Sequence, residues 1–127
     1  MTTGIRRELA ISYDEALARL PEALKTEGFG VLTEIDIAAT LKKKLDVDFR
    51  RYTILGACNP PLALEALTTS LEVGTLLPCN VIVYEEGTGS VVQAVDPLRS
   101  VGALEDPRFL QVAASVRGKL EKVINAL

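Results

Sequence analysis

Both cysteines of the 127-residue sequence lie in Cys-Asn dipeptides, Cys58-Asn59 and Cys79-Asn80. The first dipeptide ends an apolar stretch that predicts a strand, and a predicted helix follows it directly. Backbone N–H groups and the positive end of a helix dipole favour a thiolate at such a junction, and the thiolate is the nucleophilic form of cysteine. Cys58 is therefore the first candidate for chemistry. The alternative is a small buried residue, because free cysteines are among the most buried residue types.

Four neighbouring residues extend this candidate site. Gly56 lets the backbone approach a neighbouring element or a ligand closely. Asn59 is a strong helix N-cap, and Pro60 suits the first helical position. Asn59 and Asn80 could instead donate hydrogen bonds to an oxyanion or an amide ligand. The candidate ligand or thiol site thus consists of Gly56, Cys58, Asn59, Pro60, Cys79 and Asn80.

The two thiols also suggest a redox dithiol or a metal centre. The cysteines are separated by 20 intervening residues and lack a C-x-x-C signature, and a Cα–Cα distance above about 7 Å would exclude an unstrained disulfide. Two thiolates are too few for a closed zinc site, which takes four ligands. A two-fold dimer, or a carboxylate such as Glu34, Asp36 or Glu65, would have to supply the others. Cys58 and Cys79 are therefore metal ligands only if a metal is present, and no cofactor is expected.

The composition excludes several classes of function. The sequence has no histidine, which removes Ser-His-Asp and Cys-His nucleophile pairs and every metal site that uses histidine. The net charge is −3, the aromatic content is 5% and tryptophan is absent, so a nucleic-acid partner is not expected. The longest apolar run, residues 81–84, is far shorter than the roughly 20 residues of a membrane-spanning helix. An enzyme of these classes is not expected, and neither is a membrane partner.

The apolar character of the chain points to a further interface. Hydrophobic residues make up 48% of the sequence and its mean hydropathy is +0.24. This is high for a soluble chain, so we expect a homodimer that buries surface beyond one core. The length indicates a single domain over residues 1–127. The N-terminus lacks a signal-peptide pattern and the two cysteines suit a reducing compartment, so we expect a cytoplasmic protein.

Apolar periodicity and capping residues predict nine elements in the order β-α-β-α-β-α-β-β-α. Pro21 is expected to kink the first helix, or alternatively to break it into two short helices. The strand at 50–57 is expected to be central, because Ile54 to Cys58 is nearly all apolar or small. The predicted ranges are a strand at 5–11, a helix at 13–27, a strand at 29–35, a helix at 37–45, a strand at 50–57, a helix at 60–71, a hairpin of strands at 79–85 and 90–95, and a last helix that begins at Pro107.

Several of these segments resemble the domain-of-unknown-function family numbered 302. The segments that carry the resemblance are 34–36, 39–41, Tyr52 to Pro60, and Leu76 to Val81 with its L-L-P-C-N-V pattern. The likeness covers roughly residues 8–100. It implies a small α+β domain with a strongly curved, mainly antiparallel sheet of about five strands and helices packed on one face, similar to the TATA-binding-protein type of fold and often dimeric. It implies no reaction, and Cys58, Asn59, Pro60, Pro78, Cys79 and Asn80 carry over only as motif positions.

These observations lead to three hypotheses about function. The first is a small-molecule ligand bound at the Cys-Asn cleft or on the face of the sheet. The second is a thiol-dependent redox or metal-handling protein that uses Cys58 and Cys79. The third is a purely structural interaction domain, in which replacing either cysteine would cost only stability.

Overall fold

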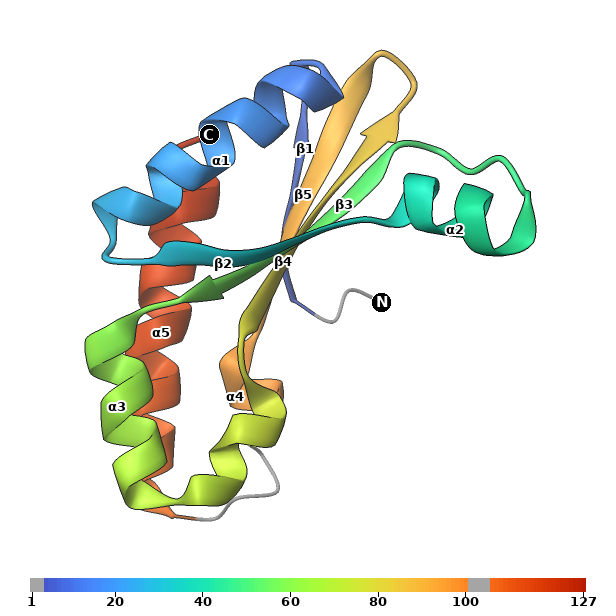
Figure 1. Ribbon diagram of the computed structural model, residues 1–127. Coiled ribbons are helices and arrows are strands. Elements are labelled where there is room, and N and C mark those ends of the chain that lie inside the picture. Colours follow the sequence, from blue (N-terminus) through green and yellow to red (C-terminus); the bar gives the residue numbers. More distant parts are fainter. Residues whose placement is uncertain (1–3, 101–105) are drawn as a thin grey trace.

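The computed structural model describes residues 4–100 and 106–127. Its centre is a five-stranded sheet in the order β1-β5-β4-β3-β2, in which every neighbouring pair is antiparallel. The sheet is strongly twisted and does not close, so β1 and β2 form its edges (Figure 1). The strands are β1 (Gly4–Leu9), β2 (Gly30–Asp36), β3 (Tyr52–Cys58), β4 (Cys79–Glu86) and β5 (Gly89–Val95).

The helices confirm the predicted order and add two short elements. They are α1 (Tyr13–Thr26), α2 (Ile37–Leu45), α3 (Pro60–Thr69), the 3-10 helix η1 (Leu71–Leu76), α4 (Pro97–Ser100) and α5 (Pro107–Asn125). The predicted helix at 60–71 ends at Thr69, because the Ser70 hydroxyl accepts from the backbone N–H of Glu72 and starts η1 instead. The predicted central strand, β3, is interior, but the middle strand is β4.

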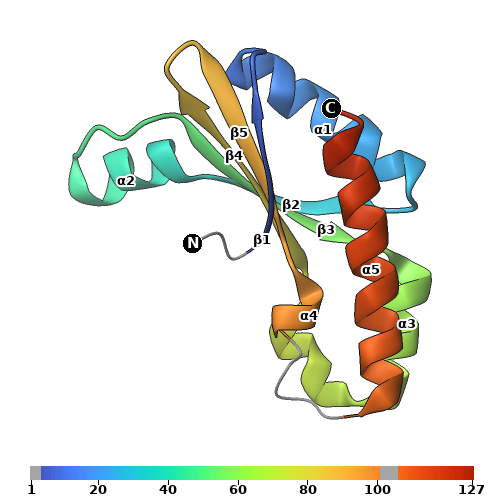
Figure 2. The ribbon, with the colours of Figure 1, turned by 180° about the vertical axis from the view of Figure 1, so that it is seen from behind.

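Three helices cover one face of the sheet. α1, α3 and α5 all lie on the same side, whereas α2 projects away from the other elements (Figures 1 and 2). Along β4, Val81 and Val83 are fully buried beneath the helices, and the residues between them point to the opposite face. The apolar side chains of α5 from Phe109 to Ile124 are buried and form the other half of this core. No helix among the described residues is long and apolar enough to cross a membrane.

α1 runs without interruption through Pro21, so the predicted alternative of two short helices is wrong. Pro21 is exposed, while Leu20 and Leu24 on the buried side of the helix are fully buried. The proline costs about 3 kcal/mol inside a helix, and burying each leucine gains roughly 1.5–3 kcal/mol. Two buried leucines therefore offset the proline. The Ser12 hydroxyl caps the helix by accepting from the backbone N–H of Glu15 at 3.2 Å.

Gly56 lies where three elements meet on the helix-free face of β3. A Cβ atom there would fall 2.8 Å from Cγ of Pro78 and would also overlap the hydroxyl of Thr33. The exposed Thr33 side chain can rotate away, but the proline ring cannot. The close approach expected for this glycine is therefore an approach to neighbouring elements of the chain itself.

We predict that Gly56→Ala lowers the free energy of unfolding by about 1–3 kcal/mol, because the added methyl group overpacks this site. The measurement is urea-induced unfolding followed by circular dichroism. The matched control is Gly30→Ala on β2, where an added Cβ meets nothing within 4 Å. That control should be neutral or slightly stabilising, since alanine replaces glycine in a strand. Equal stability of the two variants would contradict the packing argument.

Candidate functional site

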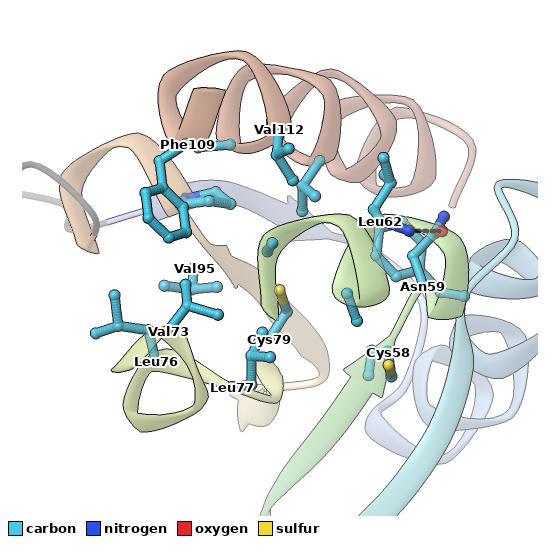
Figure 3. Close-up of a pocket in the computed structure, with 17 residues that line it drawn as sticks. Cys58, Asn59, Leu62, Val73, Leu76, Leu77, Cys79, Val95, Phe109 and Val112 are labelled. Carbon is cyan, nitrogen blue, oxygen red and sulfur yellow. Dashed lines mark hydrogen bonds between the residues drawn. The ribbon is translucent and has the colours of Figure 1, made fainter. Parts of the chain in front are cut away.

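An apolar cavity lies between the helix layer and one end of the sheet (Figure 3). α3 and η1 supply one wall, α5 supplies another, and the ends of β3, β4 and β5 supply the floor. Its volume is about 70 Å³. The lining includes the apolar side chains of Leu62, Ala66, Val73, Leu76, Phe109 and Val112, together with Cys58, Asn59 and Cys79.

The register of β3 and β4 brings both cysteines to this cavity. The two strands are neighbours, and Ala57 pairs with Cys79 on the face that the helices cover. Cys58 is the next residue and ends β3. Cys79 directs its sulfur toward the interior of the cavity, whereas Cys58 lies at the margin with its sulfur turned away from the centre (Figure 3). Both thiols are free and partly buried.

Burial makes Cys79 a weak acid. It raises the pKa of the Cys79 thiol to about 11, and the charge that Cys58 would carry as a thiolate adds to the shift. Cys79 is therefore protonated at neutral pH, and a protonated thiol is neither a nucleophile nor a metal ligand. In this state it behaves as a small, weakly polar part of the cavity wall.

Asn59 holds the rim of the cavity together. Its side chain is 8% exposed, and its Oδ1 accepts from the backbone N–H of Leu62 at 3.4 Å, which confirms the predicted helix cap. Its Nδ2 donates to the carbonyl oxygen of Glu27 at 3.1 Å and so joins the start of α3 to the chain that leaves α1. Both ends of the amide are engaged within the protein. At most one N–H remains for a ligand.

The six candidate residues do not gather at one point. Cys58, Asn59 and Cys79 line the cavity, whereas Gly56, Pro60 and Asn80 do not. Gly56 pairs with Asn80 on the helix-free face, because successive residues of a strand point to opposite sides of the sheet. Pro60 occupies the first turn of α3, as predicted, and is exposed.

The sequence did not predict the walls of the cavity. Val73 and Leu76 belong to η1, which lies between the predicted helix at 60–71 and the predicted strand at 79–85, although their apolar side chains three residues apart were a signal for a short buried turn. Phe109 and Val112 belong to α5, for which only the start at Pro107 was predicted. These residues do bury against the core, and the same side chains leave a space beside α3.

The carboxylates considered as extra metal ligands lie elsewhere. Over residues 4–100 and 106–127, no three Cys, Asp or Glu side chains come close enough to hold a metal ion. Glu34 and Asp36 line a separate polar cavity beside the start of α1, and Glu65 does not line the cavity of the cysteines. Asp36 is engaged as the cap of α2, where it accepts from the backbone N–H of Ala39 at 2.9 Å.

The polar cavity is organised around an aromatic ring and an ion pair. The hydroxyl groups of Tyr13 and Thr53 are hydrogen-bonded at 2.5 Å and are buried. The Arg51 guanidinium lies over the Tyr13 ring, 4.5 Å from its centre, and pairs with Asp14. Because this ion pair neutralises its charges internally, the cavity presents no free cation for an anionic ligand.

Comparison with known proteins identifies the family of this chain. A family model described as "Domain of unknown function DUF302" matches residues 5–127, which extends the resemblance through the last helix. The crystal structure of an uncharacterized conserved protein DUF302 from Bacillus stearothermophilus superposes with a TM-score of 0.91, at 32% identity over 98% of each chain. No curated protein matches. The chain therefore belongs to the DUF302 family of domains.

Proposed function

We propose that this domain binds a small apolar molecule, or the apolar end of a larger one, in the cavity beside Cys79. The observation that carries the proposal is the space itself. It is lined by apolar side chains from the sheet, α3, η1 and α5, and it borders the hydrophobic core. Protein interiors leave few voids, so an apolar space that is partly open to solvent supports a binding role.

The size of the cavity limits the ligand. An engineered cavity of about 150 Å³ binds benzene, and the cavity here has about half that volume. It suits a short alkyl group, with the rest of the ligand outside the mouth. The lining supports binding without a reaction, because the Asn59 amide is already engaged and the Cys79 thiol is protonated at neutral pH.

A thiol-dependent function is the second candidate, and one observation favours it. Both cysteines of the chain border the same cavity from neighbouring strands. The raised pKa of Cys79 weighs against that residue as the nucleophile, which leaves Cys58 at the margin as the reactive partner. A purely structural interaction domain is the third candidate, and it would leave the cavity without a ligand.

We also propose that the domain is a cytoplasmic homodimer. Two free thiols support a reducing compartment. Support for the homodimer comes from the large apolar side chains that remain exposed, among them Leu32 and Leu45 at 67% and 66% exposure.

The binding proposal predicts how affinity depends on chain length. In a series of straight-chain alcohols from ethanol to octanol, each added methylene should tighten binding about fourfold, from roughly 0.8 kcal/mol each, until the cavity is full. Affinity should then level off. The measurement is the NMR shift of the methyl groups of Val73, Leu76 and Val112 during titration.

Ala66→Leu tests whether the cavity is the site. The larger side chain should fill the space, so affinity should stop rising at shorter alcohols. Leu64→Ala is the control on the same helix, because Leu64 is 69% exposed and does not line the cavity. An identical alcohol series in wild type and Ala66→Leu would overturn the proposal, as would methyl shifts outside the cavity.

Alkylation by iodoacetamide separates the ligand and thiol hypotheses. Cys79 should react slowly at pH 7, and its rate should climb as the pH rises toward its pKa of about 11, because only the thiolate reacts. Bound octanol should slow Cys79 further. The measurement is mass spectrometry of native protein quenched at successive times. A fast reaction of Cys58 below pH 7, unaffected by octanol, would favour thiol chemistry over ligand binding.

A further inference from the structure

We propose that a second copy of this chain docks on the helix-free face of the sheet, with the partner's α2 packed across it. The proposal rests on the homodimer proposed above and names its interface. The surface consists of Ile35, Ile54 and Ile82 on β2, β3 and β4, together with Tyr52, Tyr84 and Phe49 beside them.

The strand register builds an apolar row on this face. Ile35 pairs with Ile54, and Ile54 pairs with Ile82, so the three isoleucines lie side by side across three strands. Ile35 is 45% exposed, and the other two are partly buried. No helix of the described residues lies over this row, since α1, α3 and α5 occupy the opposite face (Figures 1 and 2).

An aromatic group continues the row. Tyr52 and Tyr84 pair across β3 and β4, and their rings stack with 5.5 Å between centres. Phe49 lies 6.3 Å from the Tyr52 ring and is 50% exposed. Aromatic side chains that are stacked yet open to solvent are typical of interface centres, because they supply a large and rigid contact surface.

α2 carries an apolar side that is free to cover the helix-free face of a second copy. Its apolar side chains Ile37, Leu41 and Leu45 follow helical spacing, but none of its residues is buried, and Leu45 is 66% exposed. The helix projects away from the rest of its own chain (Figure 1). An apolar helix face and an apolar sheet face normally bury one another. Here one chain carries both without joining them, so a two-fold pair of chains satisfies both at once.

The charges around this surface suit a copy of itself. Arg6 and Glu8 pair at 3.0 Å on the β1 side, while Lys42 pairs with Asp46 and Asp48 at the α2 side. These ion pairs flank the apolar row on both sides, where a second copy with its α2 across the row would meet them. Both signs are then available on each side, so the copies do not repel, whereas a face of one sign would.

The test is the mass of the full chain in solution, measured by light scattering after gel filtration. Wild type should have twice the 13.7 kDa mass of one chain. Ile35→Lys and Leu45→Lys should each weaken the dimer at least a hundredfold, since a charge would enter the apolar contact. Leu64→Lys and Leu71→Lys are matched controls at 69% and 85% exposure on α3 and η1, and both should remain dimeric.

The possible outcomes distinguish failure of the homodimer proposal from failure of the interface proposal. A monomeric wild type would overturn the homodimer and this interface together, and it would leave the alcohol series on the other face unaffected. A dimer that survives in both Ile35→Lys and Leu45→Lys would overturn only the interface. If Ile35→Lys fails to fold, Leu45→Lys decides, because its side chain lies on an exposed helix end. Monomeric variants that still bind octanol would show that the two proposals stand independently.

Discussion

The antiparallel pairing of β3 with β4 determines which face of the sheet the candidate residues on these two strands occupy. With Ala57 opposite Cys79, alternate residues of both strands turn to the helix layer and those between them turn away. Cys79 therefore reaches the cavity, while its neighbour Asn80 faces solvent on the other side. A shift of one residue in this register would exchange the two faces, and would bring Ile82 inside in place of Val81. Gly56 helps to maintain the register, because only a residue without a side chain fits between Thr33 and Pro78.

Features that depend on neighbouring residues could be predicted from the sequence. The side chains of Ser12, Asp36, Asn59 and Asp106 all accept hydrogen bonds from the first turns of their helices. Such caps act over two or three residues, so they are readable without knowledge of the fold. The hairpin of β4 and β5 was predicted for the same reason, since its strands flank a loop of adjacent residues.

Features that depend on distant contacts could not be predicted. Pro21 predicted a kinked helix with a broken one as the alternative, and the burial of Leu20 and Leu24 against the sheet keeps the helix in one piece. The two Cys-Asn steps suggested one site, but strand alternation sends Asn80 to the opposite face from Cys79. The cavity depends on how η1 and α5 approach each other, and residues such as Val73 and Phe109 are far apart in the sequence. Apolar spacing shows that a side chain is buried, but it does not show whether the packing around it is complete.

Both faces of the sheet carry apolar side chains, but the two faces differ in what covers these side chains. On the covered face, three helices of the same chain bury Val81 and Val83, and a cavity remains beside Cys79. On the other face, no helix within residues 4–100 and 106–127 lies above the isoleucine row and the stacked tyrosines. Apolar side chains such as Leu64 and Leu71 are also exposed on the helices, whereas the isoleucines of this face lie beside one another on neighbouring strands. An apolar cavity behind the sheet and an apolar surface in front of it are separated by a single layer of strands. β3 and β4 contribute to both, because the strand alternation that turns Ala57 and Cys79 toward the cavity turns Ile54 and Ile82 toward the opposite surface.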